Sequence, residues 1–241
     1  RETDEVGVFG TFENGEILLI DKPLNWTSFD VVHRVRDLFH VKKVGHAGTL
    51  DPKATGLLIL CTGKKTKSID AFTGQEKEYE GIMQLGATTA SFDSETPEQN
   101  AKDFLSVTEE QIQNVFRGFL GTQLQTPPMY SAVKYGGKPL YKYARRGRTM
   151  ERQSREIVIS RFDLVKMDLP FIHFRVVCSK GTYIRAMADE CGSKFGCGAY
   201  LKELRRTRIG ALSLQQALHI EDLHVLGQRF SAQARKRESR I

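Results

Sequence analysis

Apolar residues gather along the chain in short runs that are separated by turn-forming residues. Runs of this length and composition are typical of buried strands. The clearest runs cover residues 16–20, 57–61, 78–85, 157–165 and 171–178, and a weaker one covers residues 200–207. The runs at 157–165 and 171–178 are expected to be antiparallel neighbours. Because the strands outnumber those of a simple alternation of strand and helix, we expect a mixed α+β domain built on one large sheet.

Other segments place apolar residues three and four positions apart, which predicts helices. One helix is expected to run to about Phe39, with Thr27 as its N-cap and Asp30 in its first turn. Thr108 and Gln111 form the pattern of a capping box before a second helix. That helix is expected to end near residue 116, and further helices are expected at residues 64–74, 182–195 and 214–226, the second of them capped at 181–182. Residues 88–102 are polar and predict a loop.

Residues 45–56 interrupt this pattern with three glycines, a proline and two threonines. Such a composition excludes a regular helix or a central strand and predicts a shaped loop. The loop carries His46 and Asp51 and leads directly into the apolar run at 57–61, so its polar groups are mounted on a buried strand. In the alternative interpretation, Asp51-Pro52 is only a turn in which Asp51 bonds its own backbone.

The net charge of +7 and a pI near 9.2 favour an anionic partner, most commonly nucleic acid. The four cysteines form no CxxC pair, which favours buried thiols in a reducing cytoplasm over disulfides or zinc. No apolar run approaches the ~20 residues that span a bilayer. The first twelve residues lack the layout of a signal peptide, and an opening on Arg1 suggests trimming or a fragment.

Residues 125–156 differ in character from the rest of the chain. They contain four tyrosines and eight lysine or arginine residues together with the pairs Pro127-Pro128 and Gly136-Gly137. This composition predicts a protruding hairpin and a short helix rather than a part of the core.

A few single residues could carry chemistry. Arg185 falls in the first turn of a predicted helix, where the helix dipole disfavours a cation by a few tenths of a kcal/mol. A carboxylate partner would offset that cost, and an arginine that points to solvent is the alternative. Taken alone, Tyr183 and Tyr79 are ordinary core or strand aromatics, and Lys22 is an ordinary surface lysine.

Six segments together resemble the TruB family of tRNA pseudouridine synthases. The resemblance covers about residues 16–220, in the order of the family, and is closest to the bacterial branch, which isomerises the uridine at position 55 of the tRNA T-loop. The segments are Asp21-Lys22-Pro23, the loop at 45–56, Lys77-x-Tyr79, Pro128-x-Tyr-Ser-Ala-Val-Lys-x-x-Gly-Lys-x-Leu-Tyr141, Cys178-Ser-Lys-Gly-Thr-Tyr-Ile-Arg185 and Leu204-Arg205-Arg206.

The resemblance implies a role for each matching residue. Asp51 is implied to be the catalytic aspartate and Arg185 its salt-bridge partner. Tyr79 is implied to stack on the target uracil, and His46 to hold the base out of the T-loop. The pocket is implied to be supported by Lys22, Tyr183 and Leu204. The implied RNA-binding residues are Lys64, Lys65, Tyr130, Lys134, Tyr141, Arg145, Arg146, Arg148, Arg205 and Arg206.

The family also implies a curved, mixed but mainly antiparallel sheet flanked by helices and loops, with an RNA-binding insertion at about 125–155. The reaction breaks a glycosidic bond, turns the base and makes a carbon–carbon bond, which requires neither a cofactor nor a metal. A carboxylate beside an arginine stays ionised, its pKa lowered by ~1–3 units, and attacks as a nucleophile or stabilises a cation-like ribose. Extruding the base costs a few kcal/mol, of which stacking on an aromatic recovers ~1–3 kcal/mol.

We therefore expect one catalytic domain at 1–228 and a basic, disordered tail at 229–241. Too few residues follow the match for a separate C-terminal RNA-binding domain. Ala47 stands where the family usually has threonine. The expected partner is the T-arm stem-loop of tRNA, bound by a cytoplasmic monomer with no obligatory protein partner. The alternatives are an RNA chaperone of the same fold, a guide-RNA-dependent relative, and an unrelated hydrolase. The sequence has no nucleophile motif such as GxSxG to support the hydrolase.

Overall fold

The computed structural model describes residues 15–228 and divides the chain into two compact units. The first unit consists of the described residues up to Gln75 and those from Arg206 onward, and the second unit consists of Glu76–Arg205. Each unit is described by itself below. The expectations for the first twelve residues and for the tail at 229–241 lie outside the described residues.

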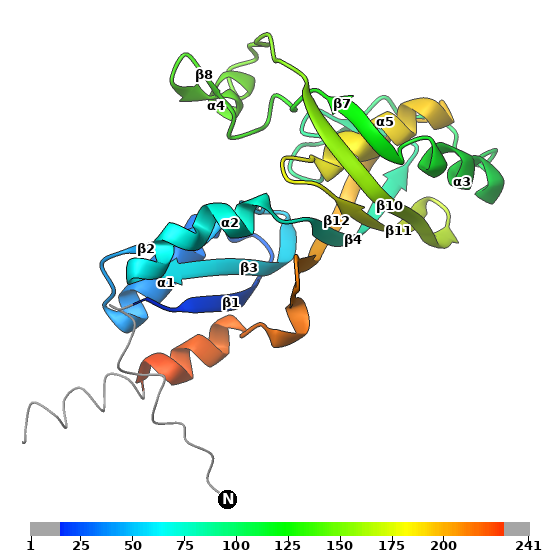
Figure 1. Cartoon of the computed structure of the whole chain (residues 1–241). Coiled ribbons are helices and arrows are strands. Elements are labelled where there is room, and N and C mark those ends of the chain that lie inside the picture. The colour runs from blue at the N-terminus through cyan, green and yellow to red at the C-terminus, as the bar shows by residue number, and fades with distance from the viewer. Residues whose placement is uncertain (1–14, 229–241) are drawn as a thin grey trace, which may run out of the picture. The chain divides into compact units, whose positions relative to one another are not determined.

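The first unit is built around strand β3, which is antiparallel to both β1 and β2. On the other side of β3, the strand order continues to the end of β12. A further helix occupies residues 220–228, where the description ends. The elements are β1 (Ile17–Lys22), α1 (Ser28–Phe39), β2 (Val44–Ala47), β3 (Ala54–Thr62), the 3-10 helix η2 (Gly63–Ser68), α2 (Ile69–Gly74), the end of β12 (Ala199–Ile209), β13 (Leu212–Ser213) and the 3-10 helix η3 (Leu214–Gln216) (Figure 1).

Strand β3 is buried on both faces, which explains its uninterrupted apolar sequence. Leu58 and Leu60 pack with the buried face of α1, including Val31 and Val35. The alternate residues of the strand form a second cluster with Ala47 and Ile209 on the opposite face. This strand carries the end of the loop at 45–56, so that end is fixed by two layers of core.

Helix α1 begins at the predicted N-cap, Thr27, which forms a full capping box with Asp30. The Thr27 side chain accepts a hydrogen bond from the Asp30 N–H at 3.1 Å, and the Asp30 carboxylate accepts one from the Thr27 N–H at 2.7 Å. The expected end at Phe39 is also confirmed, and His40 follows in the left-handed conformation. The start of this helix matters for function because the next residue, Ser28, contacts the loop that carries Asp51.

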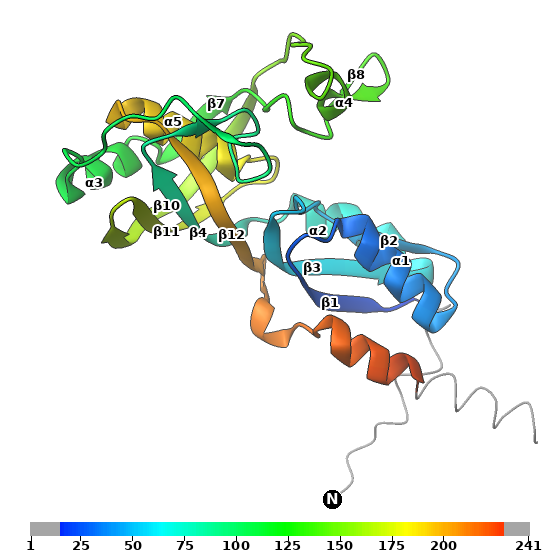
Figure 2. The same ribbon diagram turned by 180° about the vertical axis from the view of Figure 1, so that it is seen from behind.

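The second unit contains a sheet with the strand order β12-β4-β11-β10-β7, visible from behind in Figure 2. Strands β10 and β11 are antiparallel, as predicted, and so are β11 and β4. Helix α3 lies against β10 and α5. The elements are β4 (Lys77–Leu85), β5 (Thr88–Thr89), β6 (Glu98–Gln99), α3 (Glu109–Arg117), β7 (Gly121–Gln125), β8 (Lys134–Tyr135), β9 (Lys138–Pro139), α4 (Leu140–Ala144), β10 (Arg155–Asp168), β11 (Phe171–Cys178), α5 (Ile184–Phe195) and β12.

Residues 125–156 form a two-stranded hairpin of β8 and β9 followed by the short helix α4, which are the elements that their composition predicts. Figure 1 shows this segment (green) projecting from the sheet of the second unit. The architecture is a mixed, mainly antiparallel sheet with helices, so the expected α+β class is confirmed. All four cysteines are buried free thiols, as expected.

Three expectations need correction. The irregular part of the loop at 45–56 is only residues 48–53, because β2 continues to Ala47 and β3 begins at Ala54. Position 56 of strand β3 requires glycine because β12 lies close to it. A Cβ at this position would be 2.3 Å from the Arg206 carbonyl oxygen. Helix α5 is capped at Tyr183 rather than at 181–182, since the Thr182 hydroxyl donates instead to the Ser179 carbonyl at 3.0 Å. The polar segment at 88–102 contains the short β5–β6 pair.

Candidate active site

Asp51 occupies a tight turn between β2 and β3 in the first unit. The Ala54 N–H donates to the Asp51 carbonyl oxygen at 3.0 Å, which closes the turn. The side chain of Asp51 is half-buried. The alternative interpretation, that Asp51-Pro52 forms a turn, is therefore right about the backbone, but the carboxylate also interacts with the buried charge of Lys22.

The start of α1 anchors this turn through main-chain atoms. The buried Ser28 hydroxyl accepts a hydrogen bond from the Leu50 N–H at 3.0 Å and donates to the Leu50 carbonyl at 3.3 Å. The Asn25 N–H donates to the Pro52 carbonyl at 2.8 Å, and Lys53 Nζ donates to the Asn25 side chain at 2.9 Å. Both sides of Asp51 are thus fixed by groups other than its own carboxylate.

Arg206 supports the same turn from β12. Its Nε donates to the Leu57 carbonyl at 2.7 Å, and its Nη2 donates to the Gly48 carbonyl at 3.0 Å. The residue is only 1% exposed. Arg206 was expected to contact RNA, but the structure commits its guanidinium to the main chain of the loop. Arginine is suited to this position because its fork of donors satisfies two carbonyls at once.

Lys22 is fully buried beside the turn, and the surface-lysine interpretation is wrong. It lies opposite Gly56 in the β1–β3 pair, and its Nζ donates to the carbonyls of Pro23 at 2.9 Å and Trp26 at 2.6 Å. Burial lowers the pKa of Lys22 to about 8, although the Asp51 carboxylate acts in the opposite direction. The lysine is therefore mainly protonated at pH 7, and a buried positive charge lies near the Asp51 carboxylate.

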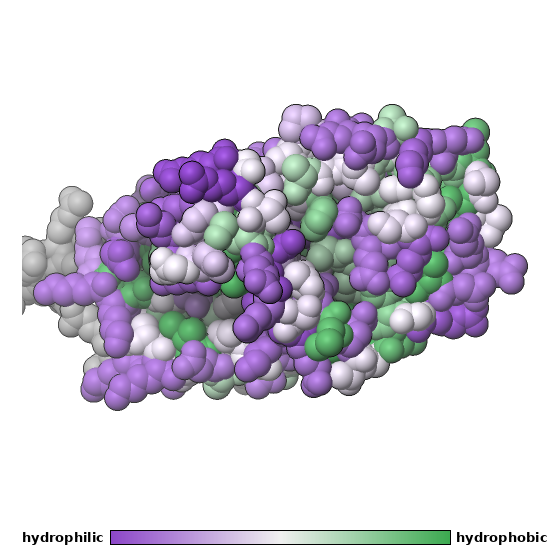
Figure 3. All heavy atoms as spheres, turned by 90° about the horizontal axis from the view of Figure 1, so that it is seen from above, coloured by the Kyte–Doolittle hydropathy of each residue, from purple (hydrophilic) through white to green (hydrophobic). Residues whose placement is uncertain are grey.

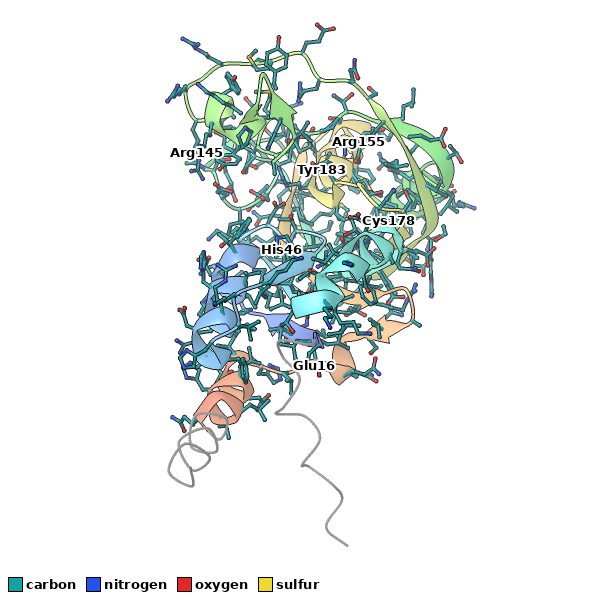
Figure 4. The ribbon with its side chains drawn as sticks, turned by 60° about the vertical axis from the view of Figure 1, so that its left-hand side comes forward. Glu16, His46, Arg145, Arg155, Cys178 and Tyr183 are labelled. Carbon is teal, nitrogen blue, oxygen red and sulfur yellow. The ribbon has the colours of Figure 1, made fainter. Side chains whose placement is uncertain are left out.

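His46 lies on β2 at the other end of the loop (Figure 4). Its ring is perpendicular to that of Phe29, with 5.5 Å between the ring centroids. Its buried Nδ1 has no hydrogen-bond partner among the described residues. Burial, and secondly the charge of Arg206, lower the pKa of His46, so the imidazole is neutral at pH 7. A neutral ring stacks without the cost of desolvating a charge.

In the second unit, Arg185 is the second residue of α5 and is 3% exposed. The solvent-exposed alternative is therefore wrong. Its Nε lies 3.9 Å from Asp93 Oδ2, and its Nη1 donates to the Ser91 carbonyl at 3.3 Å. The expected carboxylate partner is thus present within the unit. The expected pairing of Arg185 with Asp51 would join the two units and stays a prediction.

Asp93 organises a buried turn and was missed in the sequence. Its Oδ1 accepts hydrogen bonds from the Ser91 hydroxyl at 2.6 Å and the Glu95 N–H at 3.0 Å. Its carbonyl accepts from the Thr89 hydroxyl at 2.7 Å. Short polar side chains at 91–96 are typical of turns in which a side chain caps the backbone, and this was the available signal. Nothing local showed that Arg185 would lie there.

Tyr183 precedes Arg185 and is half-buried between two guanidinium groups. The Cζ atoms of Arg155 and Arg185 lie 5.9 Å and 5.5 Å from the centre of its ring. Figure 4 labels Tyr183 and Arg155. Gln125 holds its main chain by accepting from the Tyr183 N–H at 2.8 Å and donating to its carbonyl at 3.1 Å. Tyr79 is 8% exposed in β4, and Leu204 is half-buried in β12.

The residues expected to bind RNA differ in exposure. Lys64, Lys65, Lys134, Arg145, Arg146 and Arg148 are exposed, Tyr130, Tyr141 and Arg205 are half-buried, and Arg206 is buried. Arg145 forms an ion pair of 3.1 Å with Glu95 and lies over the ring of Tyr141. The face seen in Figure 3 is largely hydrophilic, and its hydrophobic side chains form small separate groups.

Two further observations concern residues 15–228. No group of three or more His, Cys, Asp or Glu side chains in this range is placed to hold a metal ion. None of the helices in this range is long and apolar enough to cross a membrane.

Comparison with known proteins identifies the family. Residues 36–184 match the model of the TruB family pseudouridylate synthase, N-terminal domain. The protein named tRNA pseudouridine synthase B in Chlorobium chlorochromatii is 51% identical over 86% of this chain and 84% of its own length. The protein of the same name in Parabacteroides distasonis is 47% identical over 88% of this chain and 93% of its own length.

Solved structures agree with this result. A chain in the crystal structure of a Cbf5-Nop10-Gar1 complex superimposes with a TM-score of 0.69 at 30% identity, over 88% of this chain and 54% of that chain. Fold and comparisons together define a pseudouridine synthase, which is an isomerase. Within that class, the chain belongs to the TruB family of pseudouridylate synthases, which confirms the resemblance seen in the sequence.

Proposed function

We propose that the chain isomerises the uridine at position 55 of the tRNA T-loop to pseudouridine. The names of its relatives, tRNA pseudouridine synthase B, support tRNA as the substrate. The observation that carries the proposal is the placement of Asp51. Its carboxylate lies on a turn that is fixed by Ser28, Asn25 and Arg206, and the buried charge of Lys22 acts on it.

Asp51 acts on the uridine through its carboxylate, which attacks as a nucleophile or stabilises a cation-like ribose. The bond from the ribose C1′ to N1 of the base breaks, and the base turns. A new bond then joins C1′ to C5 of the base, C5 releases its proton, and N1 gains a proton. The product is an isomer, and no electrons are exchanged with another molecule.

The base must leave its stack before this can happen. We assign stacking on the target uracil to Tyr79, with a further part in proton transfer, and we assign to His46 the task of keeping the base out. Arg185 is the proposed salt-bridge partner of Asp51. Lys22, Tyr183 and Leu204 support the pocket. Extrusion costs a few kcal/mol, which stacking at ~1–3 kcal/mol per base partly recovers.

The remaining contacts hold the T-arm. The exposed basic residues at 64–65 and 134–148 bind its phosphates, and the hairpin and helix of residues 125–155 close on it. Recognition of a folded loop by its shape and phosphates matches the way proteins recognise structured RNA. The enzyme works as a cytoplasmic monomer, without a cofactor, a metal or a protein partner, as an isomerisation permits.

The decisive experiment measures tritium release from a T-arm stem-loop labelled at C5 of its uridines. The purified chain is used alone, with a chelator present, and RNA binding is measured in parallel. We expect release from one uridine and no release with Asp51→Asn. An RNA that binds without releasing tritium would contradict the proposal. Restoration of release by cell extract would then favour a partner-dependent enzyme, and its continued absence would favour an RNA chaperone.

A further inference from the structure

Phe29 stands out on the surface of the first unit. Its side chain is 66% exposed, and it is the one phenylalanine classed as exposed within residues 15–228. The other exposed aromatic residue in this range is Tyr135, at 45%. A phenyl ring left in water forgoes the free energy of burial, so its place requires an explanation.

The folding of α1 does not require Phe29. The helix packs on the core through Val31, Val32 and Val35, which are at most 2% exposed. Its capping box is made by Thr27 and Asp30. The apolar contact that commonly accompanies a capped start joins the residue before the cap to the fourth helical residue. Trp26 and Val31 occupy those positions and belong to one core cluster.

Phe29 is nevertheless held close to the loop that carries Asp51. The residue before it, Ser28, makes two hydrogen bonds to the main chain of Leu50, next to Asp51. The ring of Phe29 contacts His46, at the other end of the same loop, in a perpendicular arrangement at 5.5 Å. This contact leaves most of the Phe29 side chain open to solvent. An exposed aromatic surface therefore lies at the edge of the candidate active site.

We propose that Phe29 is a stacking platform for an unpaired base of the RNA next to the uridine that is extruded. The assignment rests on the proposed function, because extrusion of a uridine deprives its neighbours of their own stacking partner. Every base presents a π-face, so an exposed aromatic ring replaces that partner without regard to sequence. Phe29 contributes to RNA affinity, whereas the bond-breaking step belongs to Asp51.

The test compares Phe29→Ala, Phe29→Leu and Phe29→Tyr with the wild type. The probe is a T-arm stem-loop with 2-aminopurine at one loop position on either side of the target uridine. Binding is measured with each Phe29 change combined with Asp51→Asn, so that no turnover intervenes, and kcat is measured in chains that retain Asp51. Leu105→Ala is the matched control, because Leu105 is 74% exposed in the second unit.

We expect Phe29→Ala to raise the Kd about tenfold, which is about 1.4 kcal/mol, with kcat at saturating RNA within about twofold of wild type. The 2-aminopurine signal at one position changes on binding, and this change is lost with Ala and Leu but kept with Tyr. Leu105→Ala binds as the wild type does. Because the ring is exposed, none of the Phe29 changes removes core packing, and equal melting temperatures verify this.

Two results would overturn the assignment. Binding by Phe29→Ala or Phe29→Leu that equals the wild type would show that no base stacks on the ring. A fall in kcat with unchanged Kd and unchanged 2-aminopurine signal would show that Phe29 acts only through His46. Tritium release by the wild type separates the two proposals: release with an unaffected Phe29→Ala removes the stacking role alone, and binding that depends on Phe29 without release removes the proposed reaction alone.

Discussion

Asp51 in the first unit and Asp93 in the second both occupy short turns beside buried basic residues, yet the turns are held in opposite ways. The turn of Asp51 is fixed through main-chain atoms by Ser28, Asn25 and Arg206. The turn of Asp93 is fixed by the carboxylate itself, whose Oδ1 accepts from Ser91 and Glu95.

This difference separates a carboxylate suited to chemistry from one suited to support. A carboxylate that holds its own turn cannot move or change its bonding without disturbing the fold. The turn of Asp51 is held by main-chain contacts with other groups, so a change in the bonding of its side chain leaves those contacts in place. We therefore interpret Asp51 as the reacting group and Asp93 as the residue that positions Arg185.

The largest expected effect is that of Asp51→Asn on the rate. We expect single-turnover pseudouridine formation to fall at least ~10⁴-fold, about 5.5 kcal/mol of barrier, because the amide neither attacks nor stabilises a cation. RNA binding and the melting temperature should stay close to wild type, since the turn is anchored elsewhere. Turnover within about tenfold of wild type would refute the assignment of Asp51 as the reacting group. A large loss of stability would show that the Asp51 carboxylate helps to hold its own turn, as the Asp93 carboxylate does.

The second effect concerns the buried pair of Asp93 and Arg185. Asp93→Asn keeps an oxygen for Ser91 and Glu95 but removes the charge that faces Arg185. Removing this buried negative charge should lower the free energy of unfolding by about 3 kcal/mol in urea at pH 7, and should slow catalysis. The matched control is Asp168→Asn, whose pair with Lys166 is 60% exposed at the aspartate and should therefore lose much less stability than Asp93→Asn.

A double variant sharpens the same point. Adding Arg185→Met to Asp93→Asn removes the buried positive charge that Asp93 faces, so part of the lost stability should return, while catalysis stays impaired. Equal loss of stability in Asp93→Asn and Asp168→Asn would mean that the buried pair contributes no more than a surface pair. In that case the interpretation of Asp93 as a residue that supports the fold and positions Arg185 would be wrong.

The third effect is a pH dependence of stability from Lys22. The pKa of this lysine is about 8 in the folded chain and 10.5 in its ordinary state. Between these values the unfolded chain holds a proton that the folded chain has lost, so raising the pH favours the folded state. Relative to Lys22→Met, the wild type should gain up to about 3 kcal/mol between pH 8 and 10.5, measured in urea.

Lys64→Met is the matched control for Lys22, because Lys64 is exposed and should show no such gain. In Asp51→Asn the window should open at lower pH, since the carboxylate is what raises the pKa of Lys22 against burial. If the difference in free energy of unfolding between wild type and Lys22→Met does not change with pH, Lys22 keeps its proton in the folded chain. This result would contradict the inference that burial lowers the pKa of the lysine beside Asp51.

Local signals were enough to predict much of the first unit. The capping box of Thr27 and Asp30 lies within four residues, and the apolar run of β3 is legible because both its faces are buried. Long-range contacts could not be predicted from the sequence. Arg206 was predicted to bind RNA, but in the structure β12 lies against Gly56 and Arg206 bonds to the main chain of the loop. Asp93 lies far along the chain from its partner Arg185. Charge and spacing do not show which side chains a fold will bury.

The smallest effect extends the comparison to binding by the second unit. Arg146 and Arg148 are exposed, whereas Arg145 is paired with Glu95. Changing both Arg146 and Arg148 to glutamine should weaken binding of the T-arm and flatten its dependence on salt, by up to ~0.7–0.9 log unit for each phosphate contact that is lost. The control is Arg117→Gln, an exposed arginine of α3 in the same unit. Because neither Arg146 nor Arg148 is assigned a part in the reaction, kcat at saturating RNA should not change. An unaltered salt slope would mean that these arginines do not touch the RNA backbone, and a fall in kcat with an unaltered slope would mean that they serve the reaction rather than the binding of the T-arm.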